Sequence, residues 1–292
     1  MPEITQYDIK HVSRYRYASP ARQCVMLLCL KPRDDRDQRL FRFEIETQPQ
    51  ASLNEETDCF GNTRHVFNIH REHEALKITA RSRVESVPLT PLPSGLGAGA
   101  WKEIDAWKAS FTHWDFTHPS ELTRSSPALA NFVDRNGITR GDDPLKDLLR
   151  LSDTLHSSFH YAPGSTSAAS PIEDILKSGR GVCQDYVHVM LAIARSWGIP
   201  ARYVSGYLTG LSSEETRADA THAWVECLLP ELGWTGFDPT NRSFADERHV
   251  RIAVGRDYQD VSPTRGVRQG GGDTRLEVDV RICARKGAHP HT

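Results

Sequence analysis

Cys183 has the surroundings that a nucleophilic cysteine needs. It follows Gly181 and Val182 and opens a stretch with helical periodicity, so it lies where a helix start leaves backbone N–H groups unpaired. These groups and the positive end of the helix dipole favour the thiolate, the reactive form of cysteine. The same groups favour the oxyanion that forms when a thiolate attacks a carbonyl. Taken alone, Cys183 is also compatible with simple packing at a helix start.

A thiolate nucleophile needs a base, and the base needs a group that orients it. His222 begins a predicted strand, and Asp238 ends the next one. The short connection Pro230–Gly233 predicts a hairpin, so His222 and Asp238 fall at the same end of two antiparallel neighbours. An aspartate there accepts one imidazole N–H and turns the other nitrogen toward sulfur. Either residue alone is an ordinary polar residue at a strand end.

Three neighbouring residues are weaker candidates for lining a substrate site: Gln184, Asp185 and Trp224. Gln184 and Asp185 directly follow the cysteine. In the first turn of a helix, Asp185 has an alternative role, which is to interact with the helix dipole. Trp224 shares a strand face with His222 by the alternation of side chains, and a core position is its alternative.

The patterns around these candidates predict strands first and helices later. The first 90 residues contain short alternating runs, such as Phe41–Glu46 and Leu76–Glu85, separated by turn residues. Repeated short strands of this kind are typical of an antiparallel β-sandwich. From Trp101 the period becomes helical, and Asp143 followed by Pro144 predicts a helix start. The second half mixes helices and strands, so we expect an α+β protein.

Composition changes divide the chain into three predicted segments. Residues 1–90 form the β-sandwich domain, residues 91–143 a linker and helical connection, and residues 144–292 the catalytic domain. The linker begins in Val87–Gly99, which holds three prolines and three glycines. Within the catalytic domain, the loop Leu211–Thr221 and the turn Gly270–Asp273 are expected to border the active-site cleft. A final alternating strand, Arg275–Ile282, follows that turn.

Charge and hydropathy exclude several classes of partner. The 292 residues hold 36 Lys and Arg against 38 Asp and Glu, a net charge of −2, so there is no basic excess for a nucleic acid backbone. The longest apolar run, Cys24–Leu30, is far too short to cross a bilayer. The first residues show no apolar segment of a secretory signal. We therefore expect a cytoplasmic protein without nucleic acid or membrane partners.

The cysteines do not indicate a metal site or a disulfide framework. Six cysteines are scattered along the chain with no CxxC pair, which disfavours both a zinc site of that type and a network of disulfides. No cofactor is expected. One alternative stays open, because hydrolytic zinc sites use three protein ligands and a water. In that interpretation Cys183, His222 and Asp238 are metal ligands.

Four motifs in the second half resemble those of the transglutaminase-like cysteine enzyme superfamily: Gly181–Tyr186, Ala192–Tyr207, Thr221–Glu226 and Gly233–Thr240. They occur in the order that places cysteine, histidine and aspartate as in that superfamily. Two early segments, His11–Pro20 and Asp58–Asn62, resemble the β-rich N-terminal domain of its bacterial members. The resemblance thus covers nearly the whole chain.

The resemblance implies a fold and a set of roles. The fold is a papain/transglutaminase-like core, in which a helix that bears the cysteine packs on an antiparallel sheet. Cys183 is then the nucleophile, His222 the general base and then acid, and Asp238 the orienting carboxylate. The calcium of animal transglutaminases is not carried over, because the chain has no EF-hand loop. The Cys183 N–H is the first candidate for an oxyanion donor, and no second donor is identified.

These roles imply acyl transfer through a thioester on a peptide or protein substrate. The acyl group then passes to water, as in a protease, isopeptidase or amidase, or to an amine, as in cross-linking. We expect hydrolysis, because excluding water takes a dedicated dry tunnel that the sequence does not reveal. Two alternatives remain: an amine-accepting transglutaminase, and a non-catalytic peptide-binding module on the same fold.

Overall fold

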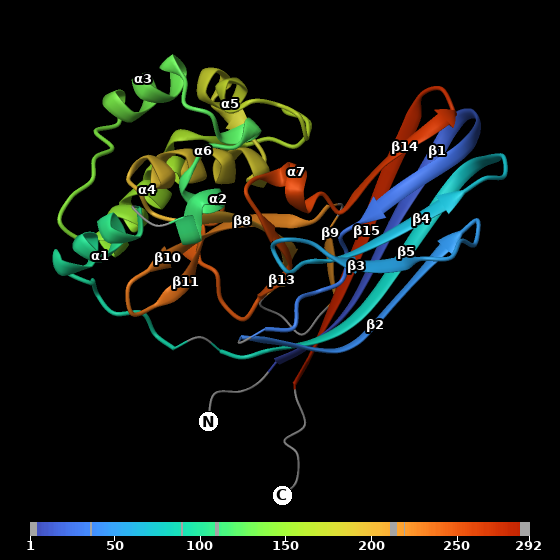
Figure 1. The fold of residues 1–292 in the computed structure, drawn as a ribbon, viewed down its shortest axis with the longest axis horizontal. Coiled ribbons are helices and arrows are strands. Elements are labelled where there is room, and N and C mark those ends of the chain that lie inside the picture. Colours follow the sequence, from blue (N-terminus) through green and yellow to red (C-terminus); the bar gives the residue numbers. More distant parts are fainter. Residues whose placement is uncertain are drawn as a thin grey trace, which may run out of the picture.

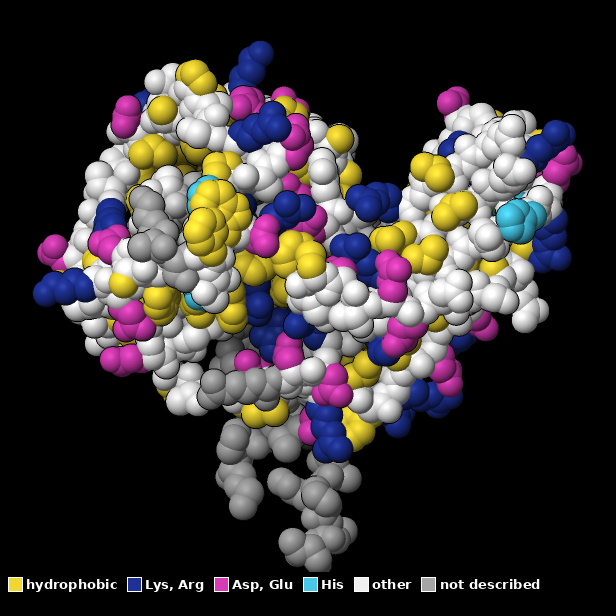
Figure 2. Space-filling view, viewed as in Figure 1, with side chains coloured by type: hydrophobic (Ala, Val, Ile, Leu, Met, Phe, Trp, Pro, Cys, Tyr) yellow, Lys and Arg dark blue, Asp and Glu magenta, His cyan; other side chains and the backbone are white. Residues whose placement is uncertain are grey.

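The protein has two lobes, one β-rich and one of mixed helices and strands (Figure 1). The structure is a computed structural model that describes residues 5–35, 37–88, 90–108, 111–210, 215–218 and 220–286. In the space-filling view a hollow separates the upper parts of the two lobes (Figure 2). The predicted α+β class is confirmed.

The β-rich lobe is one antiparallel sheet of eight described strands. They are β1 (Thr5–Leu28), β2 (Gln38–Gln48), β3 (Asn54–Thr57), β4 (Thr63–Ile69), β5 (His73–Ser86), β9 (Thr216–Ala218), β14 (Thr264–Gly270) and β15 (Thr274–Lys286). The main order is β2-β5-β1-β15-β9. Strands β4 and β14 pair with the second half of β1, and β3 pairs with β4.

The long strand β1 turns this sheet into a sandwich. Its first half pairs with β5 and β15, and its second half with β4 and β14. The pairing with β5 shifts register between Arg16 and Ala21, where the strands fold over at the right of Figure 1. Apolar side chains such as Leu28, Phe67 and Ile78 fill the space between the two layers. The predicted sandwich is therefore built from one continuous sheet folded on itself.

The C-terminal strands belong to this sandwich. Strand β14 pairs with the second half of β1, and β15 pairs with the first half, from Thr5 opposite Lys286. The predicted boundaries instead placed these residues in a catalytic domain of residues 144–292. Alternating polarity identified the final strand, but it carries no information on which distant strand is the partner. Residues 264–286 complete the N-terminal sheet.

The predicted cleft turn Gly270–Asp273 also lies in the sandwich. Gly270, Gly271 and Gly272 all have positive φ angles, which glycine adopts without steric cost. They form the bend between β14 and β15, where Gly271 N donates to Pro20 O at 3.2 Å. This bend lies at the tip of the sandwich, away from α6 (Cys183–Ser196) (Figure 1). The expectation that the turn borders the active-site cleft was wrong, because local turn chemistry does not fix its position in space.

The mixed lobe is built around a five-stranded antiparallel sheet in the order β12-β11-β10-β8-β13. The strands are β8 (Ala201–Leu208), β10 (His222–Leu229), β11 (Gly233–Asp238), β12 (Ser243–Phe244) and β13 (His249–Gly255). The longer helices are α1 (Gly99–Lys108), α3 (Pro127–Arg135), α4 (Pro144–Ser158), α5 (Ile172–Ser178) and α6. Shorter elements are η1 (Phe111–His113), α2 (Trp114–Thr117), η2 (Glu121–Thr123), β6 (His160–Tyr161), β7 (Arg180–Gly181) and α7 (Tyr258–Val261).

Helix α6 is the central element of this lobe. Most of its side chains are buried, and it packs against β8 and β10. The helix ends where Gly198 takes a positive φ of 87°, as its sequence predicts. Helices α1 and α3 contribute Trp101 and Leu129 to the same core. The helical connection before residue 144 is thus an integral part of the mixed lobe. Across the part of the chain that the structure describes, the helices are too short or too polar to cross a bilayer.

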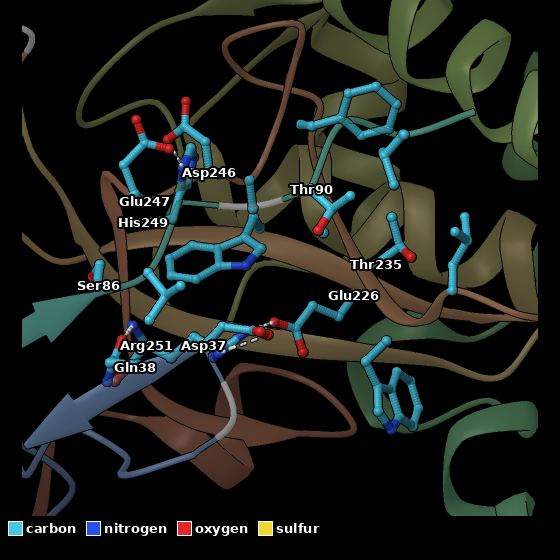
Figure 3. A pocket seen from close by; sticks show the side chains of 18 of the residues that line it. Asp37, Gln38, Ser86, Thr90, Glu226, Thr235, Asp246, Glu247, His249 and Arg251 are labelled. Carbon is cyan, nitrogen blue, oxygen red and sulfur yellow. Dashed lines mark hydrogen bonds and ion pairs between the residues drawn. The ribbon is translucent and has the colours of Figure 1, made fainter. Parts of the chain in front are cut away.

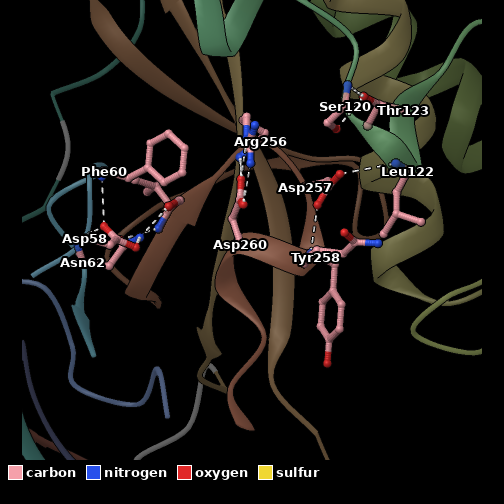
Figure 4. Close-up of polar contacts among 12 residues, drawn as sticks. Asp58, Phe60, Asn62, Ser120, Leu122, Thr123, Arg256, Asp257, Tyr258 and Asp260 are labelled. Carbon is pink, nitrogen blue, oxygen red and sulfur yellow. Dashed lines mark hydrogen bonds and ion pairs between the residues drawn. The ribbon is translucent and has the colours of Figure 1, made fainter. Parts of the chain in front are cut away.

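Two side-chain amides of the sandwich complete the outer edge of β13. Asn62 Nδ2 donates to Val254 O at 2.7 Å, and Val254 N donates to Asn62 Oδ1 at 2.8 Å. Asn62 comes from a turn that Asp58 holds together (Figure 4). Gln38 makes the same double contact with the backbone of Arg251, at 2.9 and 2.8 Å. Since an open strand edge leaves backbone groups unpaired, these amides attach the mixed lobe to the sandwich.

We predict that β15 stabilises the whole fold through its buried face. Ile282 is 2% exposed and belongs to the main core, whereas Leu276 of the same strand is 45% exposed. Ile282→Ala should lower the free energy of unfolding by about 2–5 kcal/mol, because it leaves a cavity in the core. Leu276→Ala, the matched control, should cost less than about 1 kcal/mol. Urea unfolding measures both. Equal losses would contradict this assignment of β15.

Candidate active site

Cys183 is the first residue of α6. The preceding residue, Val182, is extended, with φ −115° and ψ 176°, so the backbone N–H of Cys183 belongs to the first helical turn, whose N–H groups have no intrahelical partner. The Cys183 residue itself is partly exposed, whereas the following residues of α6, from Gln184 to Arg195, are buried. Cys183 is therefore partly accessible to solvent, and the role of its backbone N–H as an oxyanion donor stays a prediction.

His222 and Asp238 meet at one end of the central sheet, as their spacing predicts. His222 is the first residue of β10 and Asp238 the last residue of β11, and the two strands are antiparallel neighbours. His222 Nε2 lies 2.7 Å from Asp238 Oδ2. The side chain of Cys183 lies near enough to the ring to help raise the pKa of His222. Because Nε2 is bonded to Asp238, Nδ1 is the nitrogen that is available to the sulfur.

The surroundings of His222 favour its protonated form. Burial alone would lower the pKa of the ring. Hydrogen bonds and charge interactions with Asp238 and Cys183 outweigh burial and raise the pKa of His222 to about 10. A histidine held in this way is an imidazolium at neutral pH, the form that pairs with a thiolate and later donates a proton.

Asp238 is completely buried and its oxygens accept several hydrogen bonds. Oδ2 accepts from His222, from Asn241 Nδ2 at 2.7 Å and from His249 Nε2 at 3.2 Å. Oδ1 accepts from the backbone N–H groups of Thr240 and Asn241 at 3.0 and 3.2 Å. Burial would raise the pKa of Asp238, but the hydrogen bonds from His222, His249 and Asn241 hold that pKa well below its ordinary value. Asp238 is therefore a buried, charged anchor.

Sequence reasoning missed His249 and Asn241. His249 begins β13 just as His222 begins β10, and the two strands flank β8 on either side, with His222 opposite Gly206 and His249 opposite Leu208. A histidine at the start of an alternating run was the signal used for His222, and it was present again at His249. Its significance depends on strand order, which brings β13 to the same end of the sheet.

Gln184 and Asp185 hold loops and the helix start. Gln184 is largely buried, and its Nε2 donates to Ala168 O at 3.3 Å. Asp185 Oδ2 accepts from Val182 N at 2.7 Å and from Thr166 Oγ1 at 2.6 Å, and burial raises the pKa of Asp185. Asp185 thus fixes the turn that presents the nucleophile, which corresponds to the structural alternative considered for it. Direct contact of Gln184 or Asp185 with substrate stays a prediction.

Trp224 occupies a fully buried core position behind the site. Its ring packs against His249 with a centroid distance of 5.1 Å and lies 6.3 Å from that of His222. The space for the indole depends on Gly206, because a Cβ there would lie 2.4 Å from the Trp224 ring and 2.2 Å from Val250 O. Trp224 therefore occupies a position in the core, which was the alternative considered for it. Contact between Trp224 and a substrate stays a prediction.

Tyr161 is a further residue beside the nucleophile that sequence reasoning did not single out. It lies in β6, which pairs with β7 so that Tyr161 is opposite Gly181, two residues before Cys183. The side chain is 50% exposed. Burial of its hydroxyl and the nearby Cys183 raise the pKa of Tyr161. The exposed ring of Tyr161 is therefore a candidate to contact an acyl group that is bound to Cys183.

The other predicted border of the cleft, Leu211–Thr221, is only partly described. Residues 211–214 and 219 lie outside the described residues. The part between them includes β9, which pairs with β15 of the sandwich. Its place at the cleft stays a prediction.

The predicted metal alternative involves different residues in the structure. Donor atoms of His222, Asp238 and His249 all lie within 4.8 Å of one another, and these residue types bind zinc. Their spacing of 2.7 and 3.2 Å about Asp238 Oδ2 is that of hydrogen bonds. The arrangement fits two histidine rings that are hydrogen-bonded to Asp238, with Cys183 near the ring of His222.

The fold and the site together define a cysteine-enzyme core with a β-sandwich attached. Two family models match the chain: the bacterial transglutaminase-like N-terminal region over residues 7–85 and the transglutaminase-like superfamily over residues 133–239. The uncharacterized protein ML0607 of Mycobacterium leprae is 32% identical over 277 residues, which cover 94% of this chain and 97% of that protein. The uncharacterized protein Rv2569c of Mycobacterium tuberculosis is 31% identical over 284 residues, which cover 90% of this chain and 87% of that protein. The chain belongs to the transglutaminase-like superfamily, with the bacterial N-terminal region.

Two further relatives bear on the class of chemistry. A protein-glutamine gamma-glutamyltransferase of Pseudomonas aeruginosa is 37% identical over 93 residues, which cover 29% of this chain and 14% of that protein. A crystal structure from Cytophaga hutchinsonii, for which cysteine protease activity is suggested, has the same fold. Its TM-score is 0.71 at 19% identity, and the match covers 99% of this chain and 93% of that one. The structural match shows the fold, and the family supports cysteine-based catalysis without distinguishing hydrolysis from amine transfer.

The raised pKa of His222 predicts a pH dependence of stability. Its folded-state pKa of about 10 lies above the ordinary value of 6.5, so the stabilisation is complete below about pH 6.5 and is lost as pH rises to about 10. Wild type should therefore lose stability over this range relative to His222→Gln, by an amount on the order of a few kcal/mol.

Chemical unfolding at several pH values measures this difference. His70→Gln removes an exposed histidine of the β4–β5 turn and serves as the matched control. A constant difference between wild type and His222→Gln across this range would contradict the assignment.

Proposed function

We propose that the protein is a cysteine-dependent acyl-transfer enzyme that hydrolyses peptide or carboxamide bonds through a thioester. The observation that carries this proposal is the chain of contacts from Cys183 through the His222 ring to the buried Asp238. In this proposal Cys183 is the nucleophile, His222 the general base and acid, and Asp238 the orienting carboxylate. The Asp238 carboxylate is buried and accepts hydrogen bonds from several donors, which hold it in one orientation. It therefore fixes the orientation of the His222 ring.

The acylation step uses the ion pair of Cys183 and His222. The Cys183 thiolate forms a bond to the carbonyl carbon, and the carbonyl oxygen takes up the negative charge near the Cys183 N–H. When the oxyanion collapses, the C–N bond breaks, and His222 Nδ1 gives its proton to the departing amine. The products are a free amine, a thioester on Cys183 and a neutral His222.

The deacylation step regenerates the ion pair. His222 Nδ1 accepts a proton from water as the water oxygen attacks the thioester carbon. Collapse of the second oxyanion breaks the C–S bond, releases the acid and leaves a thiolate beside an imidazolium. We favour water as the second nucleophile because Cys183 is partly exposed and Tyr161 beside it is half-exposed. A site open to solvent does not exclude water.

Amine transfer is the second candidate function. The match over 93 residues to a protein-glutamine gamma-glutamyltransferase favours it. The same residues serve both reactions, because only the second nucleophile differs.

We propose a peptide or protein substrate and no nucleic acid partner, since charges of both signs are interspersed over the face in Figure 2. A non-catalytic peptide-binding module is the third alternative. A cytoplasmic location stays a prediction.

Cys183→Ala should abolish turnover and labelling by a thiol-reactive activity probe. The reason is that the probe needs the thiolate that His222 stabilises. Cys59→Ala removes an exposed cysteine outside the site and is the matched control, which should label like wild type. Prior treatment with a chelator should leave labelling unchanged. Persistent labelling of Cys183→Ala would overturn the choice of nucleophile, and chelator-sensitive activity restored by zinc would favour the metal alternative.

A glutamine-containing peptide distinguishes the two acceptors. With enzyme alone, and with enzyme plus a primary amine, mass spectrometry should show mainly the glutamate product of hydrolysis. Cys183→Ala is the negative control for both reactions. An amine adduct that forms much faster than the acid would replace the hydrolytic proposal by cross-linking. Absence of either product with every carboxamide tested, together with tight peptide binding, would favour the non-catalytic module.

A further inference from the structure

His249 links the buried carboxylate of Asp238 to a second carboxylate. Its Nε2 lies 3.2 Å from Asp238 Oδ2, and its Nδ1 lies 3.0 Å from both the backbone N and Oδ1 of Asp246. Asp246 in turn forms an ion pair with Arg248 at 2.6 Å. Both ring nitrogens of His249 are therefore engaged.

These contacts fix where the His249 proton lies. A carboxylate only accepts, so the contact with Asp238 requires a hydrogen on His249 Nε2. The neutral ring then accepts the Asp246 N–H at Nδ1, and the charged ring donates to Asp246 Oδ1 instead. In both protonation states Nε2–H continues to point at Asp238. The ring thus supplies a permanent donor to the carboxylate that holds His222.

The position of the His249 ring is fixed from several sides. The side chain is 1% exposed, and Trp224 packs edge-on against it at an interplanar angle of 75°. The backbone of β13 is held by Gln38 and Asn62 of the sandwich, as described above. The histidine therefore stands on a strand that the N-terminal lobe anchors. A donor placed so rigidly restricts the rotation of the Asp238 carboxylate.

His249 also lines a cavity of about 320 Å³. His249, Asp246 and Glu226 are among the residues that line it, together with Trp224 (Figure 3). Titratable and charged groups near the ring include Asp238 from β11, His222 from β10, and Asp246, Glu247 and Arg248 from the loop before β13. Those at the cavity include Asp37, Glu226, Glu231 and Arg251. The cavity gives a substituted side chain at position 249 room to adjust.

We propose that His249 is a positioning residue for the catalytic pair. It holds Asp238 Oδ2 directed at His222 Nε2, and so sustains the protonated His222 that faces Cys183. This inference rests on the proposed function, because it assigns His249 a part in the same chain of contacts. Without the His249 donor, the carboxylate is free to turn away, and His222 loses its proton more readily.

The test is the pH profile of Cys183 alkylation by iodoacetamide in the full-length protein, followed by mass spectrometry of the Cys183 peptide. Wild type should show an upper step in the alkylation rate, at the pH where His222 loses its proton. In His249→Phe the midpoint of the upper step should move down by about one pH unit, which corresponds to a tenfold larger acid dissociation constant of His222. His249→Gln, whose amide keeps a donor, should restore the wild-type profile.

Further variants separate this role from a general loss of stability. His65→Gln removes another buried histidine paired with a carboxylate, Glu55, in the sandwich, and should leave the profile unchanged. His249→Met lacks a donor, retains an unbranched chain, and serves if His249→Phe does not fold. A thermal melt verifies folding of each variant.

The outcomes distinguish the two proposals. A wild-type profile in His249→Phe or His249→Met, or an equal shift in His65→Gln, would overturn the role of His249. A wild type with no His222 step would instead overturn the proposed function, because Cys183 and His222 would not be coupled.

Discussion

A fully buried carboxylate is the constraint on which the rest of the structure depends. Removing an ionised carboxyl group from water is costly unless hydrogen-bond donors replace the water. Asp238 receives such donors from two histidine rings, one side-chain amide and two backbone N–H groups. To supply them, the ends of β10, β11 and β13 must meet at one end of the sheet. Helix α6 then places Cys183 near the ring of His222.

The sandwich is connected to this site through β13. Its Gln38 and Asn62 amides satisfy the outer edge of that strand, and the last strands of the chain return to close the N-terminal sheet. The N-terminal lobe therefore has a structural role at the site, because it fixes β13, the strand from which His249 contacts Asp238. This gives a physical reason why the first and last described strands, β1 and β15, pair with each other around the mixed lobe.

Local signals predicted the parts of the site that depend on neighbours in sequence. The helix start at Cys183 and the short Pro230–Gly233 connection were enough to bring His222 and Asp238 to the same strand end. The N-cap Asp143 was likewise readable, and its carboxylate accepts from Leu145 N and Lys146 N. The sequence did not predict which strand pairs with β15, and it did not predict the contact of His249 with Asp238. Both depend on pairing between distant strands, which alternating polarity does not encode.

The protonation state of His222 tests the central claim most directly. Nitrogen NMR of the ring in the intact protein at pH 8 should show hydrogens on both Nδ1 and Nε2, with deprotonation only near pH 10. Asp238→Asn should lower that midpoint, whereas Asp153→Asn, which breaks an exposed ion pair with Arg242, should leave it in place. A ring in wild type that titrates near the ordinary value of 6.5, unchanged by Asp238→Asn, would contradict the account.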